Sequence, residues 1–195
     1  AEGLRRTGYD EVSLTSLSTA DFSGIQEVVA AAVADDACGQ VSVSLPSLRV
    51  DAFTVGIAAE LQKARRTGLT FAPEAGTWRM RQVINKLISE EDLYAAVEAA
   101  YSQGWRRVKL YFLTGLPTET DEDTLAILEM ARKCIEVGRT HQRSPTVTVS
   151  VGGFVPKPFT PFQWFGQNTE DELRRKIGLL RDELKRQPKA YRGVQ

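Results

Sequence analysis

Two charged side chains follow short apolar runs of this sequence, at points where a strand would give way to a turn. Glu74 comes directly after "LTFAP", and Arg49 follows "VSVSLPSL". Ligands of parallel α/β proteins bind outside the carboxyl ends of the strands, so both side chains are expected to point into a ligand crevice. A carboxylate placed there is suited to general base catalysis or to binding a polar ligand group. The structural alternatives are a surface charge for Glu74 and an ion pair with Asp51 for Arg49.

A third candidate is the turn in "VKLYFLTGLPTETDED", residues 108–123. Gly115 leaves peptide groups uncovered where the strand ends, so a flat ligand could stack on them, and Pro117 stiffens the turn. Glu119 then either meets a ligand or serves only as negative charge in the first turn of the following helix.

The segment "GFVPKPFTPFQWF", residues 153–165, belongs to neither strand nor helix. Each of its three prolines removes an amide donor and restricts the residue before it, which favours an extended chain. Its Phe and Trp side chains supply a large apolar area. Two interpretations stay open: the segment closes the end of the fold as a plug, or it forms one wall of a substrate site.

The elements that position these residues alternate between strand and helix. Five short runs are rich in β-branched or aromatic residues, and helix-like segments separate them, which indicates parallel pairing. Since an eight-stranded barrel needs about 250 residues, the spacing predicts one domain over residues 1–195, either an open sheet or part of a barrel. The expected strands are Glu11–Leu17, Gln40–Leu45, Leu69–Ala72, Arg107–Thr114 and Thr146–Gly153.

Capping residues mark where the helices begin. Ser89, Thr120 and Thr169 each precede an acidic first turn, and the last of these has the Thr-x-x-Glu spacing of a capping box. The helix after Thr169 carries a single apolar stripe and is expected on the outside of the fold. The tail, residues 186–195, lacks periodicity and is predicted to be loose.

Composition excludes several classes of function. The 25 basic and 25 acidic residues cancel, so nucleic acid and anionic membranes are not indicated as partners. Cys38 and Cys134 lie far apart in the chain, which fits neither a disulfide scaffold nor a metal motif, and no metal site is predicted. No apolar run approaches the ~20 residues that span a bilayer. These features predict a cytoplasmic location and a small-molecule ligand.

Taken in order, five segments resemble the radical S-adenosylmethionine (radical SAM) superfamily. More narrowly, they resemble an uncharacterised group in which a region similar to cobalamin-binding domains often precedes the radical SAM core. The resemblance extends over nearly the whole chain. The segments are "TGYDEVSLTSLSTADFSGI", "VSVSLPSLRVDAF", "LTFAPEAGTWRMRQVINK", "VKLYFLTGLPTETDED" and "VSVGGFVPKPFTPFQW".

The resemblance implies an α/β fold with about five βα units of a (βα)6 barrel, that is, a partial barrel with a parallel sheet and helices outside. In that family S-adenosylmethionine binds across the strand ends, and a 4Fe-4S cluster cleaves it reductively. The implied cofactor contacts are Ser16 and Ser18 at the methionine amino group, Arg49 and Glu74 at the ribose or methionine carboxylate, and Leu113, Thr114, Gly115, Phe154 and Val155 at adenine.

One departure from the family is the absence of its C-x-x-x-C-x-x-C motif, whose thiolates hold the cluster. The first strand here matches the family's second. The chain is therefore expected to be a fragment without the cluster loop, inactive alone, with residues Val12–Ser16 as an exposed edge open to self-association. The substrate is not indicated by any residue.

Two other functions remain open at this point. One is a complete small (βα) enzyme acting on a carbonyl or phosphorylated metabolite, with Glu74 as general base and Arg49 or Lys109 as its partner. The other is a non-catalytic binding module that uses Phe154–Phe165 to dock a partner.

Overall fold

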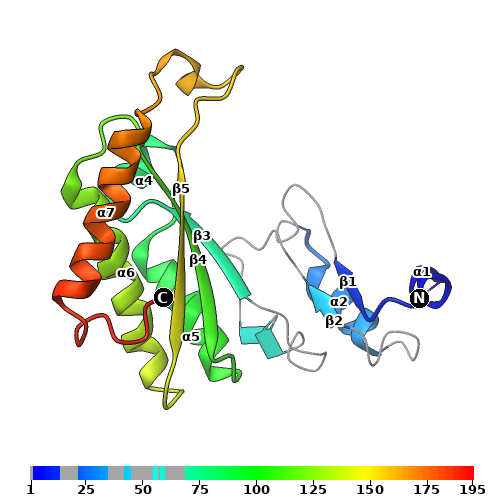
Figure 1. The fold of residues 1–195 in the computed structure, drawn as a ribbon. Coiled ribbons are helices and arrows are strands. Elements are labelled where there is room, and N and C mark those ends of the chain that lie inside the picture. Colours follow the sequence, from blue (N-terminus) through cyan, green and yellow to red (C-terminus); the bar gives the residue numbers. More distant parts are fainter. Residues whose placement is uncertain (1, 14–21, 35–41, 45–54, 57, 60–68) are drawn as a thin grey trace.

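The computed structural model describes residues 2–13, 22–34, 42–44, 55–56, 58–59 and 69–195 (Figure 1). Its strands form two parallel sheets. In the first, β1 (Glu11–Ser13) pairs with β2 (Ser42–Ser44). In the second, β3 (Leu69–Glu74), β4 (Arg107–Thr114) and β5 (Thr146–Gly153) pair in that order. The parallel α/β class expected of a partial radical SAM barrel is thus confirmed.

The helices separate the strands in the expected order. They are α1 (Glu2–Thr7), α2 (Ile25–Ala34), α4 (Trp78–Val83), α5 (Glu90–Ser102), α6 (Asp121–Arg139) and α7 (Glu170–Arg186), with a short 3-10 helix, η3 (Pro161–Trp164), before the last. One expectation differs: no pairing joins the two sheets within the part of the chain that is described. In the described parts, β1 and β2 pair over only three residues each, whereas β4 and β5 pair over eight.

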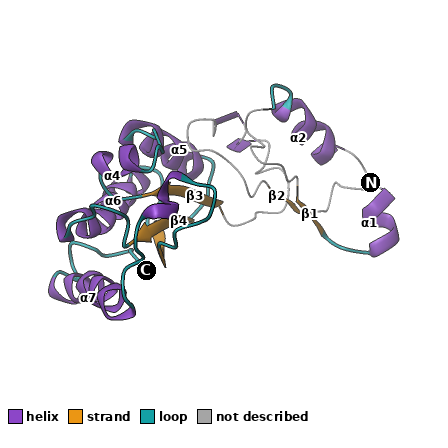
Figure 2. Cartoon of the chain, turned by 90° about the horizontal axis from the view of Figure 1, so that it is seen from above, coloured by secondary structure: helices purple, strands orange, loops and turns teal. Residues whose placement is uncertain are grey.

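The main core lies on one face of the three-stranded sheet. Side chains alternate along β4, so that Val108, Leu110 and Phe112 are buried while the residues between them are more exposed. Figures 1 and 2 show α5, α6 and α7 on the same side of this sheet. The apolar side chains of α5 and α6 belong to the same buried cluster as those of β4. The helices therefore hold the strand ends in place.

The capping residues behave largely as the sequence predicts. Ser89 and Thr120 each accept a hydrogen bond from the backbone N–H three residues later, and Asp92 and Asp123 complete two capping boxes. At Thr169 only half of the box forms: its hydroxyl accepts from the backbone N–H of Glu172. The Glu172 carboxylate instead pairs with Arg175 at 2.8 Å, which is the physical reason for the difference.

The tail, residues 186–195, was expected to be loose, but its end pairs with β5. The backbone N–H of Val149 donates to the Gln195 carbonyl at 2.7 Å, and that of Gln195 donates to the Val147 carbonyl at 2.9 Å. Val194 forms a parallel bridge with Val147. Backbone groups at the edge of β5 form hydrogen bonds with backbone groups of the tail. The end of the tail is therefore ordered against the sheet, although its sequence has no periodicity. The single domain over residues 1–195 stays a prediction, as does self-association through Val12–Ser16.

Among the described helices, none is both long enough and apolar enough to cross a membrane.

Candidate functional site

The register of the second sheet brings three strand ends to one edge. Glu74 at the end of β3 lies opposite Phe112 of β4, and Thr114 at the end of β4 lies opposite Gly153 of β5. The backbone N–H of Phe154 then donates to the Thr114 carbonyl at 2.8 Å, which extends the pairing by one residue. This carboxyl edge is where ligands bind in parallel α/β folds.

A pocket of about 360 Å³ opens between the ends of β4 and β5. This volume lies within the usual range for small-molecule sites. Three of the residues predicted to contact adenine line it together. Its lining residues are Leu113, Gly153, Phe154, Val155, Lys157, Thr160 and Phe162.

Aromatic packing shapes this β4–β5 pocket. Phe154 is buried and meets Phe162 edge to face, with their ring centroids 5.6 Å apart. Val155 is 54% exposed. The Lys157 ammonium supplies the only charge among the lining residues, and the Thr160 hydroxyl donates to the Lys157 carbonyl at 2.7 Å. An apolar wall with one cation at the rim suits a flat ring that carries a polar or anionic extension.

The rest of the Phe154–Phe165 segment divides into an inward and an outward part. Phe154 and Phe162 belong to a small buried cluster with Met80 and Leu116. Phe159 and Trp164, by contrast, are 98% and 85% exposed. The inward part closes the end of the sheet and lines the pocket at the same time, so the two interpretations of this segment are compatible. A docking role for the outward part stays a prediction.

Gly115 has a packing role that the sequence did not reveal. Its φ of 82° is in the left-handed region, and a Cβ there would lie 2.8 Å from Leu173 Cδ2 and 2.9 Å from Asn168 Oδ1. The approach of these two side chains explains why the position requires glycine. Neither Gly115 nor Thr114 is among the residues that line the β4–β5 pocket, so their predicted contact with adenine stays a prediction.

Glu119 closes the turn that follows β4. Its carboxylate accepts hydrogen bonds from the Gly115 N–H at 2.7 Å and from the Thr114 hydroxyl at 3.1 Å. Lys176 of α7 donates to the same oxygen at 2.8 Å, and the two charged side chains are only 3% and 5% exposed. A buried ion pair with further hydrogen bonds is costly to break from one side. Glu119 therefore ties β4 to α7, and its function is structural rather than ligand binding.

Glu74 is held much more loosely. Its φ is 68°, which is uncommon for a residue with a side chain, and the sheet register shifts between Phe71 and Glu74. The carboxylate lies 3.8 Å from Lys86 Nζ, beyond hydrogen-bond reach, and its side chain is 28% exposed. Burial raises the pKa of Glu74, and the nearby Lys86 charge offsets only part of that effect. Among the described residues, no side chain is shown in hydrogen-bond contact with this partly desolvated carboxylate, so a ligand could contact it.

Arg79 of α4 is structural. Its guanidinium pairs with Asp123 and donates to the Thr118 carbonyl at 2.9 Å. Thr77 caps α4, and its hydroxyl also donates to Asp123 at 2.6 Å. Burial acts to raise the pKa of Asp123, but hydrogen bonds from Thr77, Thr120 and Arg79 together lower it. This network joins α4 to the start of α6.

Gly76 lets these two helices approach each other. A Cβ at Gly76 would lie 2.5 Å from the backbone nitrogen of Ile127, a distance that no real side chain tolerates. The turn after β3 is therefore packed directly on α6, which holds Glu74 and the α4 residues at a fixed place on the sheet edge.

The predicted site residues divide into three groups. Leu113, Phe154 and Val155 line one pocket, whereas Glu74, Thr114 and Gly115 share its edge of the sheet without lining that pocket. The remaining three, Ser16, Ser18 and Arg49, lie outside the described residues. Sequence reasoning missed Lys86 and Lys176. The position of Lys176 beside the apolar stripe of α7, three residues after Leu173, was a signal that it faces inward.

The cysteines of this chain do not fit a 4Fe-4S cluster. Cys134 is fully buried in the main core, where burial raises the pKa of its thiol, and Cys38 lies outside the described residues. Cluster ligands are closely spaced thiolates. The described residues also contain no group of three His, Cys, Asp or Glu side chains arranged to hold a metal ion.

The fold is that of a parallel α/β protein with a pocket at the carboxyl ends of two of its strands. The family model of the radical SAM superfamily matches residues 1–131, and the chain belongs to this superfamily. The class as a whole uses S-adenosylmethionine and a 4Fe-4S cluster. The chain is also similar to the uncharacterized protein MJ0966 of Methanocaldococcus jannaschii, with 33% identity over 186 residues. That match covers 95% of this chain and 38% of the relative's length.

Proposed function

We propose that this chain forms the S-adenosylmethionine-binding edge of a radical SAM enzyme. In this proposal, the adenine ring occupies the β4–β5 pocket against Leu113, Phe154 and Val155. Glu74 meets the ribose or the methionine carboxyl end, together with Arg49, and Ser16 and Ser18 meet the methionine amino group.

The observation that carries the proposal is the convergence of Leu113, Phe154 and Val155 on one pocket. These residues come from two different strand ends, and the family resemblance implies that all three contact adenine. Adenine is flat and largely apolar on its faces, so the aliphatic and aromatic walls of the pocket suit it.

Calorimetric titration of S-adenosylmethionine into the chain and into a Val155→Asp variant tests the proposal. Val155 is half exposed, so the variant should fold, but it places a charge in the wall that would meet the ring. We expect at least about a tenfold loss of affinity, since an uncompensated polar group against an apolar ring costs ~1–3 kcal/mol.

Val28→Asp is the matched control. Val28 lies on α2 and is 41% exposed, close to the 54% of Val155. It should bind S-adenosylmethionine like the parent chain. Equal affinity of the Val155→Asp variant and the parent, or no binding by the parent, would refute the proposed adenine site.

Cleavage of the cofactor is a separate part of the proposal. Because the cysteines of these 195 residues do not fit a cluster, we propose that the cluster's thiolates come from outside them and that this chain alone is inactive. The test is formation of 5′-deoxyadenosine under reducing conditions, with this chain and with a longer version that carries a C-x-x-x-C-x-x-C loop. Only the longer version, loaded with iron, should form the product.

A second candidate function rests on the raised pKa of Glu74, because a general base needs a perturbed carboxylate. In that case the chain acts on a carbonyl or phosphorylated metabolite without iron. Among its suggested partners, Lys109 lies over the Tyr111 ring, 4.6 Å from its centroid, and Arg49 lies outside the described residues. A Glu74→Gln variant that still binds such a metabolite but no longer turns it over, in iron-free protein, would favour this candidate.

A further inference from the structure

A cavity of about 360 Å³ lies between β5, α7 and the end of the tail, away from the β4–β5 pocket. Its volume is at the lower end of the usual range for small-molecule sites. One leucine of α6 and the last two residues of the tail complete its lining, and none of the lining residues belongs to the β4–β5 pocket. We call it the α7 slot. Its two long walls are formed by Val149 and Val151 of β5 and by Ile177, Leu180, Arg181 and Leu184 of α7.

The packing of the last helix leaves this slot open. α7 packs chiefly against α6, and α6 in turn packs against β5. Val147 of β5 is fully buried, whereas Val149 and Val151 on the same face are only partly buried, as are Ile177 and Leu184 of α7. Figure 1 shows the tail, in red, turning back from α7 to lie beside β5, where backbone hydrogen bonds hold it. Apolar surface on both walls is therefore incompletely covered, and an apolar ligand would gain by covering it.

Arg181 supplies the only charged side chain among the residues that line the slot. It is exposed, and it forms no hydrogen bond or ion pair with any described residue. None of the residues three or four positions away in the helix is acidic, so α7 offers it no partner. This sets it apart within α7, because every other basic side chain of the helix forms an ion pair. Those side chains are Arg174, Arg175, Lys176, Lys185 and Arg186.

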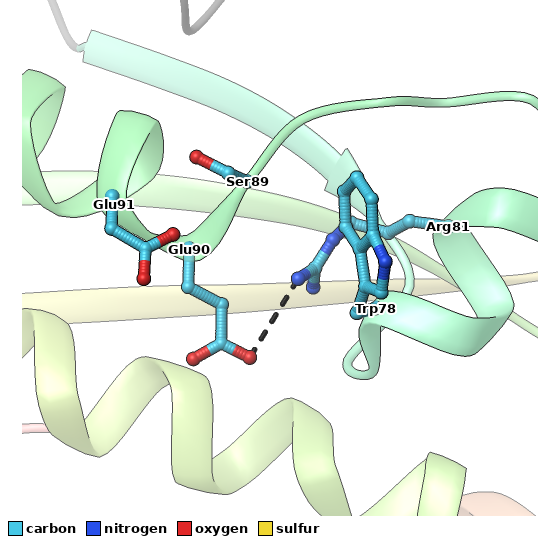
Figure 3. Close-up of a pocket in the computed structure, with 5 residues that line it drawn as sticks. All are labelled: Trp78, Arg81, Ser89, Glu90 and Glu91. Atoms are coloured by element: carbon cyan, nitrogen blue, oxygen red, sulfur yellow. Dashed lines mark ion pairs between the residues drawn. The ribbon is translucent and has the colours of Figure 1, made fainter.

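The cavity in Figure 3, of about 400 Å³ between α4 and the start of α5, provides a contrast. Its arginine, Arg81, is 1% exposed, donates to two backbone carbonyls and faces the Glu90 carboxylate. That charge is used within the fold. Two glutamates also line that cavity and would repel an anion. Arg181 is limited by neither feature, so its charge is accessible to a ligand in the α7 slot.

We propose that the α7 slot binds a single-chain aliphatic carboxylate, such as a medium-chain fatty acid. The hydrocarbon chain lies between β5 and α7 and covers the partly buried side chains on both walls, and each methylene group removed from water adds to the affinity. The carboxylate accepts hydrogen bonds from the Arg181 guanidinium, whose planar fork of donors matches the two carboxylate oxygens. The ligand therefore satisfies both the apolar walls and the unpaired charge.

Other ligands match the slot less well. A flat ring would find no aromatic side chain to stack on, because every apolar lining residue is Leu, Val or Ile. A neutral alcohol or alkane would cover the walls but leave Arg181 without a counter-charge, and a cation would be repelled by it. An extended peptide could add to the edge of β5, as the tail does, but its backbone does not supply the anion that Arg181 lacks.

Calorimetric titration of decanoate, decanol and hexanoate into the full chain, each below the concentration at which it aggregates, tests the proposal. We expect decanol to bind about tenfold more weakly than decanoate, because it loses the charge-assisted hydrogen bonds to Arg181. Hexanoate should bind about a hundredfold more weakly, because it buries four fewer methylene groups. Equal affinity for decanoate and decanol, or no decanoate binding, would overturn the proposal. In the latter case, binding of a peptide of alternating valine and threonine would identify a protein segment as the occupant.

Variants locate the ligand without relying on activity. Arg181→Gln should weaken decanoate binding about tenfold and leave decanol binding unchanged, because only the head-group contact is lost. Arg143→Gln is the matched control, since Arg143 is also exposed and has no ion pair among the described residues. Ile177→Trp should fill the slot and weaken both ligands alike. If Ile177→Trp unfolds, Arg181→Gln still decides, because its side chain is exposed: unchanged decanoate affinity in that variant refutes the site.

Discussion

Glu74 and Glu119 are two carboxylates at the same edge of the sheet, yet their surroundings are opposite. Glu119 is almost fully buried and accepts three hydrogen bonds, one of them from the Lys176 ammonium. Glu74 is partly exposed, and its carboxylate lies 3.8 Å from Lys86 Nζ. The same edge therefore contains one carboxylate that is hydrogen-bonded within the fold and another that is partly open to a ligand. Position after a strand therefore does not by itself distinguish a carboxylate that the fold uses from one that a ligand could contact.

Glu119→Gln should have the largest effect on stability. The glutamine can still accept from the Gly115 N–H, but it leaves the Lys176 ammonium buried without a counter-charge. We expect the free energy of unfolding, measured with urea, to fall by about 3 kcal/mol. The double variant Glu119→Gln with Lys176→Met should recover most of this loss. A loss below about 1 kcal/mol in the single variant would mean that Glu119 is as dispensable as a surface charge.

Gly115→Ala should come next. The added Cβ would meet Leu173 and Asn168 at under 3 Å, and alanine is disfavoured at the positive φ of this residue. Overpacking and backbone strain together should lower the free energy of unfolding by about 2 kcal/mol. Gly166→Ala is the control, because nothing lies within 4 Å of its Cβ position. Equal stability of the two variants would show that the turn after β4 is not tightly packed.

Glu74→Gln should separate binding from stability, in contrast to Glu119→Gln. Burial makes the ionised Glu74 unfavourable, so the variant should be at least as stable as the parent at pH 7. Its affinity for S-adenosylmethionine should fall about tenfold, the equivalent of one lost hydrogen bond to a charged group. Urea unfolding and calorimetry on the same preparation measure both. A clear loss of stability without a loss of affinity would reverse the assignment of Glu74 and contradict the comparison.

The pH dependence of stability should show the smallest effect. The raised pKa means that folded Glu74 binds its proton more tightly than in the unfolded chain, where the pKa is near 4.5. Stability should therefore decrease as pH rises from about 4.5 through the higher folded value, and then level off. Subtracting the Glu74→Gln profile from that of the parent isolates this contribution. A difference that increases with pH in this range would mean that Glu74 is stabilised as the anion.

Asp123 should contribute a pH dependence of stability opposite in sign to that of Glu74. Its lowered pKa stabilises the folded state above the ordinary value near 3.8, and this contribution should be lost as pH falls through the folded value. Asp123→Asn should therefore be less stable than the parent at pH 7, with the difference shrinking in acid.

Helix caps and individual strands could be predicted from the sequence, because a few neighbouring residues determine them. The caps at Ser89 and Thr120 depend on a hydroxyl and an acidic residue three positions apart, and β4 is recognisable from its alternating side chains. The parallel class followed from the order of such elements. These features need no information about distant parts of the chain.

The parts that could not be predicted depend on contacts between distant residues. Lys176 lies on α7 and Glu119 in the turn between β4 and α6, and the packing of α7 brings them together. The role of Gly115 depends on Leu173 and Asn168 for the same reason. The sequence left Arg81 open between a surface charge and a site residue, because its burial depends on contacts with the turn after β3, where its guanidinium donates to the Ala75 and Gly76 carbonyls. For the candidate site, the sequence placed both carboxylates at the carboxyl edge of the sheet but did not show that Glu119 would be paired with Lys176.

Mapping of amide chemical shifts during titration with S-adenosylmethionine tests the central claim most directly. The account predicts that the largest shifts fall on residues 113–115 and 153–157, with a further shift at Glu74 and small changes along α5. Saturation with shifts confined to other residues, or no shifts at the ends of β4 and β5, would contradict a cofactor site at the carboxyl edge of this sheet.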